Sequence, residues 1–197
     1  MITHAQSIAP VYKKYIKAAL QDPLVNMVMI ETYQPGGYFA AACRYITQYT
    51  REAMQECLDD CYSVLPTHVL GLASLVNIKR KAHLLLLDFD AGKNDVVRGP
   101  ALVQQTHDAA QDIWLEYGLP GTFILVRSSK SGIHVLGTEL IDWTTYSRIL
   151  QGGCVGVDQL YCQWSLARGY GTLRMTRGGN KTYRPRAITG VNYNGST

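Results

Sequence analysis

Two aspartates end a run of four leucines in LLLLDFDAGKND, where Asp88 and Asp90 are separated by one residue. The leucines predict a buried strand, and side chains two positions apart on a strand point to the same face. Two neighbouring carboxylates repel each other, and a divalent cation is the usual reason for a protein to hold them together. We therefore favour a metal site here over the alternative, two solvated acids in a turn.

Asp158 is a third candidate carboxylate, because it follows the apolar stretch in GCVGVDQLY. A two-metal site for phosphoryl transfer uses about three carboxylates from separate strands. Asp is also a favoured N-cap, and taken alone Asp158 is better explained as the cap of the helix that follows. The metal hypothesis requires all three carboxylates to surround one small ion site.

The segment ILVRSSKSGIHVLG predicts two strands joined by a turn, with Arg127 before the turn and His134 after it. Hydroxyls, turn amides, Lys130 and an imidazole gathered at one hairpin could hold a triphosphate. A single histidine on a strand is more often structural, so this segment depends on the other motifs for its meaning.

The charge of the chain is divided unevenly along its length. Residues 1–158 carry 13 Lys and Arg against all 15 Asp and Glu, whereas residues 159–197 carry six basic residues and no acid. Aromatic residues are interleaved with these charges, namely Tyr161, Trp164, Tyr170, Tyr183 and Tyr193. Basic side chains neutralise phosphates and aromatic rings stack on bases, so the segment is typical of a nucleic-acid surface. A solvated basic face is the alternative.

The order of these motifs resembles the archaeo-eukaryotic primase superfamily, which includes the primase-polymerases. That family's first motif is a hydrophobic strand ending in DxD, matched by Leu84 to Asp90. Its second motif is Ser…His, matched by Ser131 and His134, and its third is an Asp after apolar residues, matched by Asp158.

A later Leu-Arg segment followed by Lys-Thr in the family is similar to TLRMTRGGNKTYRP, which contains Arg174 and Lys181. Two departures qualify the resemblance. Ser131 stands three residues before His134 rather than two, and residues 91–133 contain no cysteine for the zinc-binding insertion of replicative primases. The resemblance therefore implies a minimal catalytic core of the plasmid, phage or primase-polymerase type.

The resemblance implies a role for each matched residue. Asp88, Asp90 and Asp158 would hold two Mg²⁺ or Mn²⁺ ions and, with His134, form the catalytic set. The expected contacts to the nucleoside triphosphate are Arg127, Lys130, Ser131, His134, Arg174 and Lys181. The expected contacts to a single-stranded DNA template are Arg168, Arg177, Arg184, Arg186, Tyr170 and Tyr183. A helicase domain or protein is a further partner that the resemblance allows.

The pattern of elements predicts an α+β fold in one domain over residues 1–197. The resemblance implies an N-terminal α/β unit over 1–80 joined to an RRM-like antiparallel sheet over 81–197. We expect helices over 5–23, 38–62 (with a break near Thr50), 100–118, 140–153 and 158–169. We expect strands over 24–33, 122–129 and 132–138, a hairpin of 67–78 with 82–90, and a closing hairpin of 172–176 with 183–188.

Composition excludes several classes of protein. With 47% hydrophobic and 17% charged residues, the chain is neither disordered nor a coiled coil. No apolar run of about 18 residues predicts a membrane span, and the N-terminus lacks the layout of a signal peptide. We expect a cytoplasmic protein with free, mostly buried cysteines. Cys57 and Cys61 would share a helix face, and Cys43 and His68 could join them, but the spacings fit no standard zinc site.

Two other motifs are incompletely matched, and one alternative function remains. LLLLDFDAG resembles the start of a haloacid-dehalogenase phosphatase, but Ala91-Gly92-Lys93 replaces the expected residues and no acid follows Asp158. RGGNKT is not a phosphate-binding P-loop, because Asn180 occupies the required glycine. A non-catalytic domain that binds single-stranded nucleic acid remains the alternative to a template-dependent nucleotidyltransferase.

Overall fold

A computed structural model describes residues 3–35, 44–90, 99–178 and 181–188, and within them the chain has the α+β composition predicted. The helices are α1 (Pro10–Ala19), α2 (Arg51–Cys57), α3 (Pro100–Tyr117), α4 (Trp143–Gln151) and α5 (Gln159–Arg168). The first six strands are β1 (His4–Ser7), β2 (Met27–Tyr33), β3 (Tyr45–Thr50), β4 (Cys61–Val64), β5 (Val69–Ala73) and β6 (Leu75–Asn77). The others are β7 (Ala82–Asp90), β8 (Phe123–Arg127), β9 (Gly132–Asp142), β10 (Thr172–Arg174) and β11 (Arg186–Ala187).

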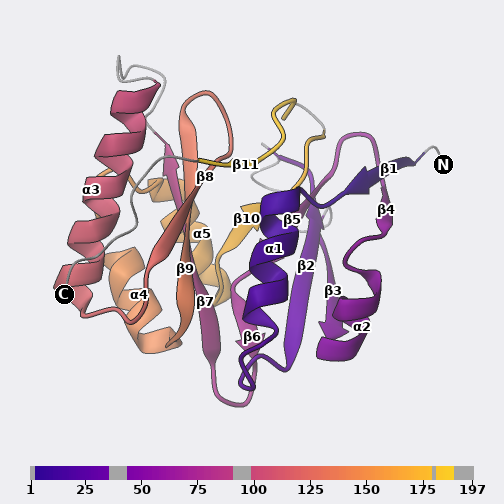
Figure 1. Ribbon diagram of the computed structural model, residues 1–197, viewed down its shortest axis with the longest axis horizontal. Coiled ribbons are helices and arrows are strands. Elements are labelled where there is room, and N and C mark those ends of the chain that lie inside the picture. The colour runs from indigo at the N-terminus through magenta and orange to yellow at the C-terminus, as the bar shows by residue number, and fades with distance from the viewer. Residues whose placement is uncertain (1–2, 36–43, 91–98, 179–180, 189–197) are drawn as a thin grey trace.

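The strands form antiparallel sheets, two of which lie side by side (Figure 1). A five-stranded sheet has the order β11-β8-β9-β7-β6, and a four-stranded sheet has the order β10-β5-β2-β3. β1 and β4 pair separately. Helix α1 lies in front of the strands in Figure 1, and α5 lies behind β8 and β9. None of the described helices has the length and apolar character that a membrane crossing requires.

Strand β7 lies between β9 and β6 and carries the leucine run. Leu84 to Leu87 are at most 3% exposed, because helices and the neighbouring sheet cover both faces of the strand. The antiparallel register with β9 places Asp88 opposite His134 and Asp90 opposite Gly132. The buried strand therefore brings the two predicted motifs to the same end of the five-stranded sheet.

Helix α1 joins the N-terminal segment to this sheet. Tyr12 and Tyr15 are buried on the face of α1 that packs against β9. The Tyr15 hydroxyl donates a hydrogen bond of 2.7 Å to the carbonyl of Gly137. A buried hydroxyl needs such a partner, and this bond is one contact between α1 and β9.

Two tyrosines anchor α4 and α5 to the middle of β7. The hydroxyls of Tyr146 and Tyr161 both donate to the carbonyl of Leu86. Gly171 lies directly against these hydroxyls, and a Cβ atom added there would overlap both of them. The absence of a side chain at this position is therefore part of the core packing behind Asp88.

We expect Gly171→Ala to lower the free energy of unfolding by about 2 kcal/mol, because the added methyl group must displace two buried tyrosines. Urea denaturation measures this change. Gly153→Ala is the matched control: Gly153 has a φ of 64°, and a Cβ there would meet nothing within 4 Å. Its cost is the left-handed backbone alone, about 1 kcal/mol. Equal losses in the two variants would contradict the packing argument.

Several predicted elements are confirmed. Strand β2, helix α5 and helix α3 occupy the expected segments, and α3 ends at Gly118 in the left-handed conformation (φ 59°). The predicted helix over 5–23 is shorter, because residues 4–7 pair with β4 before Pro10 begins α1. Residues 140–142, predicted as helix, extend β9 until Asp142 caps α4.

The helix predicted over 38–62 is wrong over most of the described part. Tyr45–Thr50 is an edge strand paired along β2, and only Arg51–Cys57 is helical. The β-branched and aromatic residues of YITQYT fit an exposed edge strand better than a helix. Residues 36–43, including Cys43, lie outside the described part of the chain.

The cysteine predictions also need correction. Cys57 ends α2 and Cys61 begins β4, so the two thiols do not share a helix face. Cys162 is buried as predicted, but Cys61 is exposed. Cys57, Cys61, Cys154 and Cys162 are free thiols.

Two predicted hairpins are divided between the sheets. Within 67–78, β5 pairs with β2 and β10, and only β6 pairs with β7. The predicted closing hairpin is wrong, because β10 pairs with β5 while β11 pairs with β8. Both sheets have an edge whose backbone groups need partners, and the C-terminal segment supplies a strand to each.

Candidate functional site

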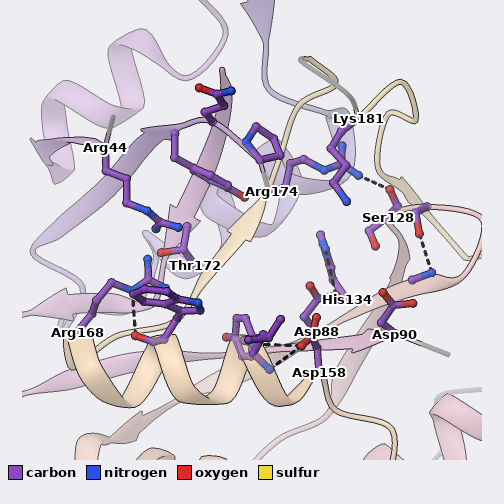
Figure 2. A pocket seen from close by; sticks show the side chains of 18 residues that line it. Arg44, Asp88, Asp90, Ser128, His134, Asp158, Arg168, Thr172, Arg174 and Lys181 are labelled. Atoms are coloured by element: carbon purple, nitrogen blue, oxygen red, sulfur yellow. Dashed lines mark hydrogen bonds and ion pairs between the residues drawn. The ribbon is translucent and has the colours of Figure 1, made fainter. Parts of the chain in front are cut away.

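A cavity of about 200 Å³ lies between the two large sheets at the C-terminal end of β7 (Figure 2). Its polar and aromatic lining comes from Tyr33, Gln34, Arg44, Asp88, Asp90, Ser128, Ser129, His134, Asp158, Tyr161, Trp164, Arg168, Thr172, Arg174 and Lys181. All four residues predicted as catalytic are in this set. The structure thus brings together catalytic candidates that lie up to 70 positions apart in the sequence, from Asp88 to Asp158.

Backbone pairing places Asp158 beside the DxD strand. The amide of Asp158 donates to the carbonyl of Asp88 at 2.8 Å, and Val157 forms an isolated bridge with Phe89. The Asp158 side chain also accepts hydrogen bonds from the amides of Leu160 and Tyr161, at 2.8 and 3.2 Å. The N-cap prediction is therefore confirmed, and the same residue adds its carboxylate to the cavity.

Burial and two neighbouring carboxylates disfavour the ionisation of Asp88. Burial raises the pKa of Asp88 to about 7, and the neighbouring charges of Asp158 and Asp90 add to the increase. Arg174 and Lys181 oppose it by stabilising the charged form. A carboxyl whose ionisation is resisted in this way gains from a nearby cation, which is the electrostatic condition that a metal site meets.

His134 faces Asp88 across the β7–β9 ladder. Its Nε2 atom lies 3.7 Å from Oδ1 of Asp88, and its Nδ1 atom is hydrogen bonded to the hydroxyl of Tyr12. Burial lowers the pKa of His134 well below 6.5, and the charges of Arg174 and Lys181 lower it further. The imidazole is therefore neutral at pH 7, and the Tyr12 hydroxyl decides which of its nitrogens carries the proton.

Tyr12 was not among the residues predicted from sequence, since it lies 122 positions from its partner. We expect its hydroxyl to donate to Nδ1, which leaves Nε2 as a donor facing the cavity. Nitrogen-15 NMR of His134 should show the Nε2–H tautomer in the wild type, and a mixture of tautomers in Tyr12→Phe. Tyr15→Phe, one turn along α1, is the matched control. A wild-type Nδ1–H tautomer would contradict the assignment.

The β8–β9 turn contributes residues other than those first expected. Ser128, Ser129 and Gly132 line the cavity, whereas Arg127, Lys130 and Ser131 are not among the residues that line it. The Ser129 hydroxyl accepts bonds from the amides of Ser131 and Gly132, at 3.3 and 2.7 Å. These hydrogen bonds stabilise the turn, and Ser128 and Ser129 are its serines that line the cavity.

Arg174 and Lys181 both line the cavity. Arg174 is 7% exposed, and its guanidinium donates to the carbonyls of Thr176, Tyr183 and Ser128. Arg174 therefore ties the C-terminal segment to the β8–β9 turn. The contact with phosphates that the resemblance implied for it stays a prediction.

The other basic residues of the C-terminal segment are placed differently. Arg177, Lys181 and Arg184 line a second cavity of about 600 Å³ that shares Lys181 with the first. Arg184 also donates to Ser7 and Ile8 near α1. Two cation–π pairs complete the set, with Arg186 over Tyr183 and Arg168 over Tyr170.

A further charged group, which sequence reasoning missed, lies at the other end of the first cavity. Glu31 on β2 is fully buried and forms ion pairs with Arg44 and Arg168. The available signal was the single acid inside the apolar strand MVMIETY, because a buried carboxylate requires a charged partner.

The donor set fits a divalent cation in its chemistry. Asp88, Asp90 and Asp158 offer oxygen ligands, which Mg²⁺ and Mn²⁺ prefer. In the described ranges no three His, Cys, Asp or Glu side chains form a group that could hold a metal ion, so the arrangement of three carboxylates around one ion that the metal hypothesis requires is not formed in this structure. The fit therefore rests on three carboxylates that line one cavity and on their mutual effect on the pKa of Asp88.

In comparisons with known proteins, no protein-family model and no curated protein matches this chain.

Proposed function

We propose that this chain is a template-dependent nucleotidyltransferase, a DNA primase or primase-polymerase that extends a strand on single-stranded DNA. One observation carries the proposal. The bond from the Asp158 amide to the Asp88 carbonyl sets a third carboxylate beside the DxD pair, and His134 lies 3.7 Å from the same Asp88. If Asp158 and His134 had been remote from Asp88, the non-catalytic alternative would have been favoured.

In this proposal each residue has a chemical role. Asp88, Asp90 and Asp158 would hold two Mg²⁺ or Mn²⁺ ions, and such ions would supply Lewis-acid activation of a hydroxyl and charge neutralisation at the phosphates. The neutral His134 donates a hydrogen bond to a phosphate oxygen, and Lys181 adds a positive charge on the same side. Ser128 and Ser129 orient the triphosphate for in-line attack.

The template strand fits the second cavity. Among the described residues that line it, Arg177, Lys181 and Arg184 are basic and none is acidic, so its field attracts a phosphate backbone. Because Lys181 borders both cavities, a strand in the second would lie next to a nucleotide in the first.

Primer extension on single-stranded DNA tests the proposal. The purified protein, labelled nucleotides and Mg²⁺ or Mn²⁺ should give products that lengthen with time and disappear when EDTA is added. Tight binding of single-stranded DNA without any product, by protein shown to be folded, would favour the non-catalytic binding domain.

A further inference from the structure

The group formed by Glu31, Arg44 and Arg168 is the strongest feature that the proposed chemistry leaves unused. The Glu31 carboxylate accepts from Nη1 of Arg44 at 2.7 Å and from Nη1 of Arg168 at 3.2 Å. The Glu31 side chain is 1% exposed, whereas those of Arg44 and Arg168 are 31% and 19% exposed. The acid is enclosed, and the two cations reach the cavity.

Aromatic rings hold both arginines in place. The Arg44 guanidinium lies 5.0 Å from the ring centre of Tyr33, and that of Arg168 lies 5.1 Å from Tyr170. Nε of Arg168 also donates to the carbonyl of Trp164 at 3.1 Å. Cation–π contacts and ion pairs fix the direction of a flexible side chain, so both guanidinium groups are oriented before any ligand arrives.

The group carries a net positive charge, since two arginines share one carboxylate. Both arginines line the cavity, together with Trp164, which is 38% exposed. Planar guanidinium groups match the oxygens of a phosphate, and an exposed indole ring offers a surface for a base to stack on. This combination suits a nucleic-acid strand.

The position of Arg44 and Arg168 in the cavity indicates which nucleic-acid strand they would contact. Figure 2 shows Arg44 and Arg168 on the opposite side of the cavity from Ser128 and Lys181, with Asp88, Asp90 and Asp158 below Ser128 and Lys181. In an in-line displacement, the attacking oxygen and the leaving group stand on opposite sides of the phosphorus atom. With the triphosphate near Ser128 and Lys181, the attacking 3′-end must arrive from the side of Arg44 and Arg168.

We infer that Arg44 and Arg168, positioned by the buried Glu31, bind the terminal phosphodiester of the acceptor strand, the strand whose 3′-hydroxyl is extended. The inference rests on the proposed function for the identity of that strand. It adds an acceptor-strand subsite to the cavity, distinct from the triphosphate side and from the template path along Arg177 and Arg184.

Steady-state extension of a primer–template separates the two sides of the cavity. Arg44→Gln and Arg168→Gln should each raise the KM for the primer about tenfold, and change the KM for the nucleotide less than twofold. Arg80→Gln is the matched control, because Arg80 is exposed in the turn at the far end of β7. A raised nucleotide KM with an unchanged primer KM would overturn the inference, as would behaviour equal to that of Arg80→Gln.

A binding measurement keeps this inference distinguishable from the proposed function. We expect the dependence of log K on log salt, for a fluorescent oligodeoxynucleotide without metal, to become shallower by about 0.7 for each arginine removed. If the wild type extends no primer, the proposed function fails. A shallower slope in the two variants would then still place a strand on Arg44 and Arg168, and a slope equal to that of Arg80→Gln would overturn that as well.

Conservative variants address the stability of the ion-pair group. Replacing one arginine leaves Glu31 with a single partner, so urea denaturation must accompany each assay. Arg44→Lys and Arg168→Lys keep a charge opposite Glu31 and remove only the planar, two-pronged geometry. We expect both to raise the primer KM about threefold, and an unchanged primer KM in both would contradict a direct phosphate contact.

Discussion

Asp88→Asn should reduce nucleotide incorporation by about a thousandfold, the loss that corresponds to about 4 kcal/mol of transition-state stabilisation by bound metal. The substitution preserves the shape of the side chain and removes one charged ligand between Asp90 and Asp158. Primer extension in Mg²⁺ and in Mn²⁺ measures the loss. Asp112→Asn, an exposed acid on α3, is the matched control and should retain full activity.

The stability of Asp88→Asn should depend on pH differently from that of the wild type. The pKa of Asp88 is about 7 in the folded chain, above the value near 3.9 expected for an unfolded one. The unfolded chain therefore ionises first, and this carboxyl lowers the stability of the folded wild type as the pH rises from about 4 to about 7. In EDTA, the unfolding free energy of Asp88→Asn should gain on that of the wild type between pH 5 and pH 8.

Added metal should stabilise the wild type more than Asp88→Asn, the reverse of the effect expected from rising pH in EDTA. Mg²⁺ or Mn²⁺ that binds only the folded protein should raise the melting temperature of the wild type, and have little effect on Asp88→Asn. Full activity in Asp88→Asn would mean that the site has been placed wrongly. An equal rise in melting temperature for both proteins would show that the ion binds elsewhere.

Arg174→Met should lower the free energy of unfolding by about 3 kcal/mol. Its guanidinium donates to three backbone carbonyls from Thr176, Tyr183 and Ser128, and a thioether leaves all three without that donor. Buried acceptors that lose a charged donor cost about 1–3 kcal/mol each when water cannot replace it. Urea denaturation at constant pH measures the loss.

Arg177→Met is the matched control, since Arg177 lies three residues along the same segment and is exposed. Its effect should stay within about 0.5 kcal/mol. Arg174→Lys should recover little of the loss, because a single ammonium cannot reach all three carbonyl acceptors in the way that a planar guanidinium does. Equal stability of Arg174→Met and Arg177→Met would contradict a structural role for Arg174.

Local sequence was sufficient to predict β7 and α3. The leucine run predicts β7, because continuous apolar residues require a strand covered on both faces. The amphipathic segment between Pro100 and Gly118 predicts α3, because both ends carry the residues that helix ends favour. The same reasoning fails for YITQYT and for the C-terminal segment, where the partner strands come from distant parts of the chain.

The sequence by itself determined the acids and the histidine of the candidate site, since DxD on a strand and a histidine after a turn are local patterns. Only the tertiary structure decided that Asp158 lies beside Asp88, that Tyr12 holds His134, and that Glu31 gathers Arg44 and Arg168. Each of these contacts joins residues that the chain separates widely, except Glu31 with Arg44. Such pairs form because buried charges and hydroxyls must find partners once the sheets pack, and residue spacing alone carries no record of which partner that will be.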